Sequence, residues 1–496
     1  MDKTEIPFAH IEALRAEIES RALSAHEVTD VFLARIEKID PDVGGYVAVW
    51  PERAREAARC LDEKQAAGAS LGPLHGIPIA IKDLCDVAGF PTKAGTTVLG
   101  REPARETAHV VARLEEAGAV ILGKTKMTEG AFVAHHPSVK KPFNPWRMSR
   151  WTGISSSGAG CVVAAGMATA ALGTDTGGSI RYPSAACSLT SLKPTHGRIS
   201  LHGIFPFAPS LDTVGPMARS VQDAATLYAV MAGRDPRDGW SFKAKVPEPI
   251  LGPVKPKSRR VRIGVDKKFA GCIVDRDVMD VFHNLLSDLR NLDVQFVEIH
   301  LPDLSEVHPA WLTIATSELA LSHAATYPAE SEQYGPALRA AIVNGLAQTG
   351  GQVARAWQVR EEWKRRLEAC FEEIDVIISP IFPGRLGLDT DLLDPKTFPD
   401  AATAVRLATP FNLSGSPVLT LPCGTDRGDI PVTIQLVGPQ HGEARLLALG
   451  QAYQSSSRWH DLRPIQFRPG FIPNAEVPFE PLFRLGGCLP GLPARG

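Results

Sequence analysis

Apolar residues recur along the chain with two different periods, which predict helices in some segments and short buried strands in others. Residues 8–39 have the helical period and predict two amphipathic helices. The second helix is expected to begin near Ser24, because Ser24 and Glu27 have the spacing of a capping box. The runs 76–85 and 119–122 are typical of buried strands, and a helix is expected just before the second run.

The second half of the chain continues this alternation. The runs VRIGV (261–265), VQFVEI (294–299), EEIDVIISP (372–380) and PVTIQLVGP (431–439) predict strands, and a helix is expected near 276–290. Helices that alternate with strands in this way favour an α/β core built in layers.

Length and two Pro-rich segments bound the number of domains. A chain of 496 residues is long enough for two to four domains, or for one large α/β unit with insertions. Residues 234–260 are rich in proline and charged residues and predict a connector. Residues 466–496 are rich in proline and glycine and predict an extended or poorly ordered tail.

The bulk composition is that of an ordinary globular protein, with 44% hydrophobic and 22% charged residues. A net charge of -2 and the lack of a long basic block argue against nucleic acid as a partner. The longest apolar stretch, 161–173, is too short to cross a membrane, and the first residues lack a secretory pattern. The eight cysteines are scattered without a CxxC pair, which favours a cytoplasmic protein without a disulfide framework or structural zinc site.

Two short motifs match known functional patterns but have the wrong surroundings. GAVILGKT (118–125) fits the phosphate-binding pattern GxxxxGKT. In a P-loop the four middle residues form a flexible loop, but here they are Ala-Val-Ile-Leu, which is typical of a strand. GASLG (68–72) fits the nucleophile-elbow pattern, but a polar helix end and a proline loop flank it in place of a strand and a helix. We therefore interpret Lys124 as a strand residue and Ser70 as a turn residue.

The segment 153–186 is rich in serine, glycine and alanine and contains a candidate nucleophile. Two Ser/Gly turns flank a Gly/Ala-rich stretch, 158–173, that predicts a buried helix, and the second turn, TDTGGS, runs into a helix that begins SIRYPS. Glycines let a substrate approach the backbone and a helix N-terminus favours negative charge, so Ser179 would attack beside an oxyanion hole. The amides expected to form this hole are those of Thr176, Gly177, Gly178 and Ser179. Taken alone, the same pattern fits a pair of ordinary turns equally well.

The wider sequence resembles the amidase signature family. The resemblance rests on SSSGAG…AAGM…ALGTDTGGSIRYPSAACSLTSLKPTHGRIS and on the upstream run GIPIAIKD, and it covers residues 8–462. It further includes the runs AGAVILGKTKMTE, FNPW, SLDTVGPMARSVQDAA, FNLSGSPVLTLPCG and PVTIQLVGP. The family's lysine falls on Lys82, and its two serines, 24 positions apart, fall on Ser155 and Ser179.

This resemblance implies a Ser-Ser-Lys triad that works through an acyl-enzyme. Ser179 would be the nucleophile, Lys82 the base, and Ser155, which follows a cis peptide bond in the family, the relay between them. A lysine accepts a proton only when it is neutral, and burial in an apolar strand lowers its pKa from the ordinary value of about 10.4. The chemistry implied by the family needs no metal and no organic cofactor.

The resemblance also implies the fold, a compact α/β/α unit in which helices sandwich a large mixed, twisted β-sheet. Residues 1–465 would form this single domain, with residues 466–496 outside it as the tail. The expected parts of the domain are N-terminal helices (8–39), a catalytic core (70–230) and a second part (260–465). The residues expected to support the turn around the nucleophile are Thr174, Asp175 and Arg181.

The sequence departs from the family pattern at three positions. Ile154 precedes the relay serine where the family usually has glycine, and Ser157 replaces another glycine. Lys126 stands where many relatives have asparagine, which leaves open whether a charge lies near the acyl group. Outside the motif, we interpret the His135-His136 pair as part of a polar loop, and Gln435 as an outward polar position on its strand.

The expected activity is cleavage of the C–N acyl bond of small or aryl amides. Carbamates would be cleaved by the same acyl chemistry, as in a urethanase. One alternative is the glutamine-hydrolysing subunit of a tRNA-dependent amidotransferase, and another is a nucleotide-binding module built on 118–125.

The expected partner is a small-molecule substrate, without nucleic acid or membrane. A homodimer is compatible with this interpretation, and the sequence does not fix the oligomeric state. The pocket would be walled by 126–150, 200–210 and 305–410.

Overall fold

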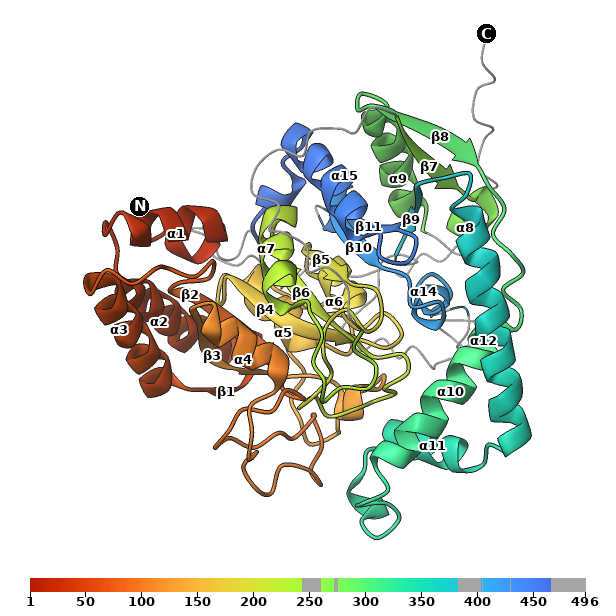
Figure 1. Cartoon of the computed structure of the whole chain (residues 1–496), viewed down its shortest axis with the longest axis horizontal. Coiled ribbons are helices and arrows are strands. Elements are labelled where there is room, and N and C mark those ends of the chain that lie inside the picture. The colour runs from red at the N-terminus through yellow and green to blue at the C-terminus, as the bar shows by residue number, and fades with distance from the viewer. Residues whose placement is uncertain (243–259, 272–274, 382–402, 404, 429, 465–496) are drawn as a thin grey trace.

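The computed structural model describes residues 1–242, 260–271, 275–381, 403, 405–428 and 430–464 (Figure 1). One mixed sheet of eleven strands organises these residues. Its strands are β1 (Tyr46–Val49), β2 (Ile77–Lys82), β3 (Ala119–Thr125), β4 (Ala170–Asp175), β5 (Thr190–Lys193), β6 (Thr213–Ala218), β7 (Val261–Val265), β8 (Val294–Glu298), β9 (Val376–Pro380), β10 (Val418–Thr425) and β11 (Pro431–Val437). The predicted tail, 466–496, and most of the predicted connector lie outside the described residues.

The strands follow the order β1-β3-β2-β4-β6-β5-β10-β11-β9-β7-β8 across the sheet. The pairs β2–β3, β2–β4, β7–β8 and β7–β9 are parallel, and the other neighbours are antiparallel. Strands from the first and second halves of the chain meet at the β5–β10 pair, where Leu192 lies opposite Leu419. One sheet therefore runs through both halves of the sequence.

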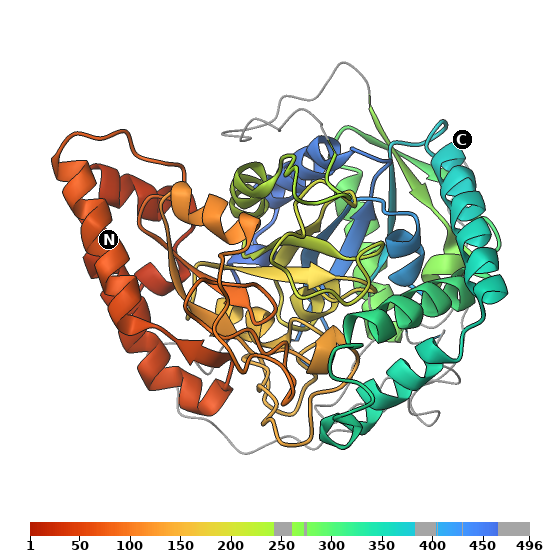
Figure 2. The ribbon, with the colours of Figure 1, turned by 60° about the horizontal axis from the view of Figure 1, so that its bottom comes forward.

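Helices flank the sheet (Figure 2), which confirms the predicted α/β class. The longer helices are α1 (Ile11–Glu19), α2 (Ala25–Val43), α3 (Pro51–Ala66), α4 (His109–Glu116), α5 (Ser157–Ala164), α7 (Val221–Met231), α9 (Arg276–Leu289), α10 (Val307–Ser322), α11 (Pro336–Leu346), α12 (Gly350–Cys370) and α15 (Glu443–Ser456). The short ones are η1 (Ile6–Phe8), η2 (Glu129–Ala131), α6 (Arg181–Ala186), α8 (Lys267–Gly271), η3 (Ser331–Gln333), α14 (Thr409–Leu413) and η4 (Trp459–Asp461). No helix in these ranges is both long and apolar enough to cross a bilayer.

Several local predictions are confirmed. The side chain of Ser24 accepts a hydrogen bond from the Glu27 amide, and the Glu27 carboxylate accepts one from the Ser24 amide, so the capping box starts α2. Every residue of β2 is buried, as expected for a strand with neighbours on both sides. The helix and strand predicted between 109 and 125 are α4 and β3.

The helix predicted over 158–173 is wrong in its second half. The helix α5 ends at Ala164, Gly166 adopts a positive φ of 69°, and residues from Ala170 onward form strand β4. Alanine favours helices, but β4 pairs with β2 on one side and β6 on the other. The hydrogen bonds of two neighbouring strands outweigh that local preference.

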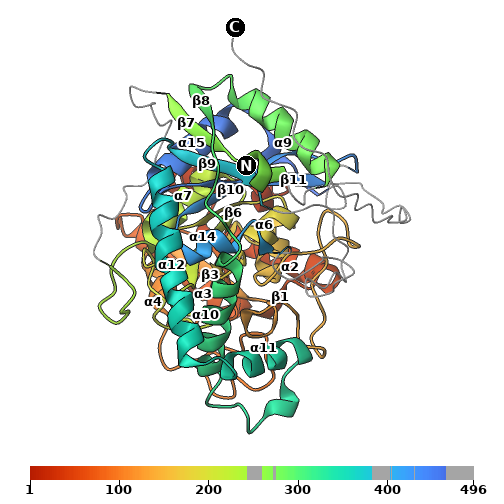
Figure 3. The same ribbon diagram turned by 90° about the vertical axis from the view of Figure 1, so that its right-hand side faces the viewer.

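The helices α10, α11 and α12 pack against one another at one end of the molecule. Figure 3 shows α10 and α12 running side by side in front of the sheet. The helix α10 also packs against α14 and brings Trp311 to the turn that follows β4. This packing places a residue from the second half of the chain beside the predicted nucleophile.

Candidate active site

Lys82 ends the central strand β2 with its side chain fully buried. Its Nζ donates hydrogen bonds to Ser155 Oγ at 2.7 Å and to Thr174 Oγ1 at 2.9 Å. Burial lowers the pKa of Lys82 to about 7, although Cys85, Asp212 and Asp175 nearby act in the opposite direction. A substantial fraction of this amine is therefore neutral near physiological pH.

Ser155 lies in the turn that leads into α5, and the turn is tied to neighbouring segments at both sides. The Ile154–Ser155 peptide bond is cis, as the family resemblance implied. The carbonyl of Ser155 accepts a hydrogen bond from the Thr128 amide at 3.1 Å. Ser155 is fully buried, and its Oγ accepts the hydrogen bond from Lys82.

Ser179 lies in the loop between β4 and α6, and 9% of its surface is exposed. The amide of Ser156 donates to the carbonyl of Ser179 at 3.3 Å, so the two Ser/Gly turns contact each other directly. A Cβ added at Gly177 would lie 2.5 Å from Cζ2 of Trp311. Glycine is therefore required there by close packing, in addition to any approach by a substrate.

The amides around Ser179 are not equivalent. The Gly178 amide donates to Asp175 Oδ1 at 2.8 Å, so in this structure it is engaged within the protein. No hydrogen bond links the Gly177 or Ser179 amide to another residue of the described ranges. The helix α6 begins two residues after Ser179, so these amides belong to the loop and not to the helix's first turn. The oxyanion role of Thr176, Gly177, Gly178 and Ser179 stays a prediction, and Gly178 is its least available donor.

A fully buried ion pair supports this loop. Arg181 donates to both carboxylate oxygens of Asp175, from Nε at 3.0 Å and from Nη2 at 3.1 Å. Arg181 also donates to Asn412 Oδ1 at 2.6 Å, and Asn412 Nδ2 returns a bond to Asp175 at 2.7 Å. Burial alone would raise the pKa of Asp175, but Arg181 and Asn412 hold it well below its usual range. Asp175 is thus a carboxylate at neutral pH.

Gln435 completes the same network, which corrects its interpretation as an outward polar residue. Its side chain is fully buried on β11, accepts a hydrogen bond from Arg181 at 3.1 Å and donates to the Leu407 carbonyl at 2.6 Å. The alternating pattern of β11 misleads here because both faces of this central strand are covered. Asn412 was not singled out from the sequence, although it lies in the FNLSGS run that carries part of the family resemblance.

Thr176 is held from two sides by residues that sequence reasoning missed. Its hydroxyl donates to Asp212, and its carbonyl accepts a hydrogen bond from the indole N–H of Trp311 at 2.8 Å. Burial raises the pKa of Asp212 to about 6, although the amides of Phe207 and Ala208 also bind it. Asp212 lies in the SLDTVGP run, which is a usable signal, whereas Trp311 lies in a helix without family pattern.

The three departures from the family pattern have separate surroundings. Ile154 packs in a small apolar cluster with Trp151 and Tyr182. The hydroxyl of Ser157 is 3.1 Å from Nε2 of His135, whose pKa is lowered to about 4 by burial, so this histidine is neutral. The ammonium of Lys126 donates to a loop carbonyl, that of residue 140, at 3.3 Å and is not among the groups that contact Lys82.

The two rejected motifs are ordinary structural elements. Residues 119–125 are the buried strand β3, and Lys124 Nζ donates to the Pro91 carbonyl and to Thr92 Oγ1, each at 2.7 Å. The Lys124 ammonium therefore makes its hydrogen bonds inside the protein. Ser70 is exposed in the loop that follows α3. The strand interpretation of Lys124 is confirmed, and Ser70 lies in a loop without the strand and helix of a nucleophile elbow.

A cavity of about 340 Å³ lies near the helix that carries Trp311. It is lined by parts of 266–269, 301–309 and 403–410, and His308 in its wall stacks on Trp311 with ring centroids 5.5 Å apart. The walls expected at 126–150 and 200–210 do not contribute to it. The location of the substrate pocket among the predicted walls therefore stays a prediction.

Known proteins resemble this chain over most of its length. The model of the family described as Amidase matches residues 27–447. The putative amidase AmiD of Mycobacterium tuberculosis is 38% identical over 455 residues, which cover 90% of this chain and 94% of the relative. One subunit of the glutamyl-tRNA(Gln) amidotransferase of Chloroflexus aurantiacus is 36% identical over 492 residues, with 93% of this chain and 99% of that relative covered.

Solved structures show the same likeness in three dimensions. A crystal structure of an amidase superposes with a TM-score of 0.80 at 31% sequence identity, over 90% of this chain and 99% of that one. The family match spans both halves of the sheet, including the strand that carries Lys82 and the two turns that carry Ser155 and Ser179. The chain is therefore a hydrolase of the Amidase family.

Proposed function

We propose that this protein hydrolyses C–N acyl bonds with Ser179 as nucleophile, Ser155 as relay and Lys82 as base. The observation that carries the proposal is the 2.7 Å contact between Lys82 Nζ and Ser155 Oγ, both fully buried. The lowered pKa of Lys82, about 7, supplies the neutral amine that a base requires. The hydrogen bond from the Ser156 amide to the Ser179 carbonyl keeps the two serine-bearing turns in contact, which is the proximity that a relay through Ser155 requires.

In the first half of the reaction, neutral Lys82 takes the Ser155 proton while Ser155 takes the proton of Ser179. The Ser179 oxygen bonds to the acyl carbon, and the negative charge moves to the acyl oxygen, which loop amides stabilise. The proton then returns through Ser155 to the leaving nitrogen, the C–N bond breaks and an amine departs. Water attacks the resulting ester by the same route, which releases the acid and restores Ser179.

The proposed substrates are small or aryl amides, with carbamates as a second class. Both classes present an acyl carbon with a nitrogen leaving group, so the same triad serves both. The putative amidase that is 38% identical over most of this chain supports the choice of amides. Carbamate cleavage rests on the shared acyl chemistry alone.

A second candidate is the glutaminase role within an amidotransferase complex. The 36% identity to one chain of the glutamyl-tRNA(Gln) amidotransferase covers 99% of that relative and favours this candidate. It would need partner subunits to receive the released ammonia. A nucleotide-binding role is not supported, because the Lys124 ammonium donates its hydrogen bonds to Pro91 and Thr92.

The test combines active-site labelling with a substrate panel. A fluorophosphonate should label Ser179 in the purified protein, and Ser179→Ala should abolish both labelling and turnover of anilides, primary amides and carbamates. Ser155→Ala should also be severe, with a residual rate from the remaining oxyanion donors. The matched control is Ser70→Ala, an exposed loop serine, which should keep full activity. Label on another serine, with Ser179→Ala still active, would overturn the triad.

A further inference from the structure

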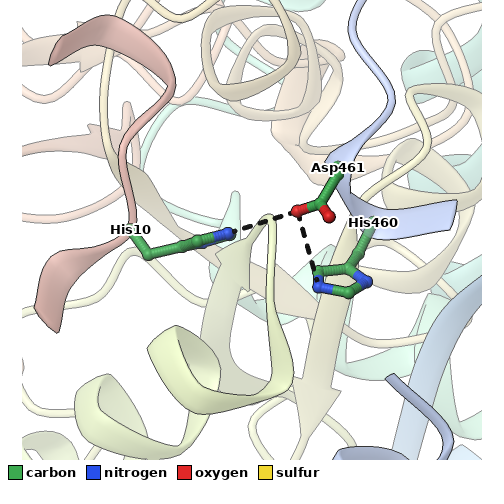
Figure 4. A group of neighbouring side chains, drawn as sticks. All are labelled: His10, His460 and Asp461. Carbon is green, nitrogen blue, oxygen red and sulfur yellow. Dashed lines mark ion pairs between the residues drawn. The ribbon is translucent and has the colours of Figure 1, made fainter. Parts of the chain in front are cut away.

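Two histidines and a carboxylate meet where the first and last described segments of the chain come together (Figure 4). Asp461 Oδ1 lies 3.6 Å from His10 Nε2 and 3.6 Å from His460 Nε2. His10 immediately precedes α1, whereas His460 and Asp461 belong to η4. One ligand atom from each of the three residues lies within 4.8 Å of the others.

Two of the three separations between ligand atoms are close to those of a tetrahedral zinc site, and all three lie within 4.8 Å. Zn²⁺ binds imidazole nitrogen and carboxylate oxygen at about 2.0–2.2 Å, which separates neighbouring ligand atoms by roughly 3.3 Å. The two separations of 3.6 Å exceed this value by a fraction of an ångström, within reach of small side-chain rotations. The Asp461 side chain is 46% exposed, so solvent reaches the group and can supply the remaining ligands.

Asp223 gives His10 the arrangement of a metal-binding histidine. The buried Asp223 carboxylate lies 3.1 Å from His10 Nδ1, and its other oxygen accepts the Ile11 amide at 2.9 Å. A carboxylate accepts hydrogen bonds, so the Nδ1 atom carries a proton, and Nε2, which faces Asp461, is the ring nitrogen left to bind a metal ion in place of a proton. Carboxylate–histidine pairs of this kind orient imidazole ligands in known metal sites.

An ordinary ion pair between one histidine and one carboxylate does not account for the contacts of Asp461. His26 and Asp30, one turn apart on α2, show what an ordinary histidine–carboxylate pair looks like, with one histidine and a separation of 3.5 Å. At Asp461 two histidines face the same oxygen, and one of them is also held from behind by a buried carboxylate. Two imidazoles and one carboxylate form a donor set suited to zinc and its neighbours in the transition series.

We propose that His10, His460 and Asp461 bind a divalent transition-metal ion of the zinc type, with water in the open position. The ion would join the N-terminal segment to the segment that follows α15. The same two segments are already joined by the ion pair between Arg463 and Glu5, at 2.7 Å. The site would thus fasten the two ends of the folded unit, apart from the catalytic residues.

The test measures zinc binding to the full chain after removal of metal with EDTA. Titration calorimetry with Zn²⁺ should give one site of micromolar or stronger affinity, and Zn²⁺ in excess should raise the Tm by mass action. Co²⁺ in place of Zn²⁺ should give the visible absorption of a four-coordinate ion. Asp461→Asn and His460→Gln should each weaken binding by about 100-fold or more and remove the rise in Tm, because each deletes a direct ligand.

His26→Gln is the matched control, since it removes a surface histidine of an ordinary carboxylate pair, and it should bind zinc as the wild type does. Circular dichroism and an unchanged Tm without metal would show that the ligand variants are folded. Absence of measurable binding to the wild type would overturn the proposal. So would binding that persists unchanged in both Asp461→Asn and His460→Gln, because the ion would then lie elsewhere.

Discussion

At the scale of single residues, Lys82 is a basic side chain in surroundings that exclude water. The side chain is fully buried, and the groups that contact its Nζ are two hydroxyls, those of Ser155 and Thr174. Neither hydroxyl neutralises an ammonium, so burial favours the uncharged amine and lowers the pKa to about 7. The same physical effect that costs stability therefore provides a base that works near neutral pH.

The pH dependence of kcat/KM should report this residue. Activity should rise as pH increases through about 7, because Lys82 must lose its proton before it can accept one from Ser155. Lys82→Arg and Lys82→Ala should each lower kcat/KM by roughly 10²- to 10⁴-fold, since neither side chain can serve as a base. Rates of amide hydrolysis between pH 5 and 10 measure the effect.

Lys193 is the control for this assignment. It is a second fully buried lysine whose pKa burial lowers to about 7, and its Nζ donates to the Pro194 carbonyl. Lys193→Met should keep the acid limb of the profile, whatever its effect on stability. If that limb disappears in Lys193→Met, or Lys82→Arg keeps normal turnover, Lys82 is not the base.

The free energy of unfolding should also depend on pH through Lys82. Between pH 7 and 10 the unfolded chain holds a proton on Lys82 that the folded chain has released, so wild-type stability rises with pH over this window. Lys82→Met removes this contribution. Its free energy of unfolding, relative to wild type, should fall by at most about 1.4 kcal/mol for each pH unit raised. Urea unfolding at several pH values tests this, and a difference independent of pH would contradict it.

Among the elements, the loop after β4 is held by a network that four of them share. Asp175 comes from β4, Arg181 from α6, Asn412 from α14 and Gln435 from β11. Because every member is buried, each polar group depends on the others for its hydrogen bonds. The position of Ser179 is thus set in part by Gln435, which is 256 positions away in sequence, and local turn chemistry alone does not provide such a contact.

Breaking this network should be costly. Asp175→Asn leaves the Arg181 guanidinium buried without a countercharge, and should lower the free energy of unfolding by roughly 3–5 kcal/mol. Activity should fall with it, because the loop amides lose their support. Arg365→Ala on α12 removes an exposed ion pair with Glu362 and should change stability by less than about 1 kcal/mol. Chemical denaturation compares the two variants, and equal costs would contradict the proposed role.

The strand β3 yields a prediction about the rejected phosphate-binding motif. Lys124→Ala should leave the Pro91 carbonyl and the Asp83 carboxylate without their buried partner, at a cost of roughly 1–3 kcal/mol. Neither the wild type nor the variant should bind ATP in equilibrium dialysis, because the lysine is committed within the protein. Micromolar ATP binding that Lys124→Ala abolishes would restore the nucleotide-binding alternative.

For the whole molecule, the continuous sheet makes the two halves of the chain mutually dependent. The β5–β10 pair joins strands more than 200 residues apart, and α10 carries Trp311 back to the loop of the first half. The proposed catalytic residues all lie in the first half, whereas part of their support comes from the second. A fragment of residues 1–242 would therefore lack Trp311, Asn412 and Gln435.

This chain by itself should be sufficient for amide hydrolysis if the leading proposal is correct. Purified protein should turn over small or aryl amides without added partner proteins, because the triad and its support are contained in one chain. Light scattering coupled to size-exclusion chromatography would give the oligomeric state of the active species. Activity confined to glutamine, and dependent on partner subunits, would favour the amidotransferase alternative.

Much of this arrangement could be predicted from the sequence, because it depends on local signals. The capping box at Ser24, the buried strand that ends at Lys82 and the Gly/Ser turns around Ser155 and Ser179 each involve neighbouring residues. Spacing and local propensity are readable in such segments. The resemblance to a family added the pairing of the lysine with the two serines, which no local pattern contains.

The tertiary structure decided the features that depend on distant residues. It placed residues 170–173, expected at the end of a helix, in strand β4, because two neighbouring strands supply the hydrogen bonds. It turned Gln435 inward to Arg181 and brought Trp311 to Thr176. It also brought His10 to within 3.6 Å of Asp461, residues that are 451 positions apart in sequence. Burial, pairing and ligand geometry are properties of the folded chain, so the sequence alone determined the local elements but not these contacts.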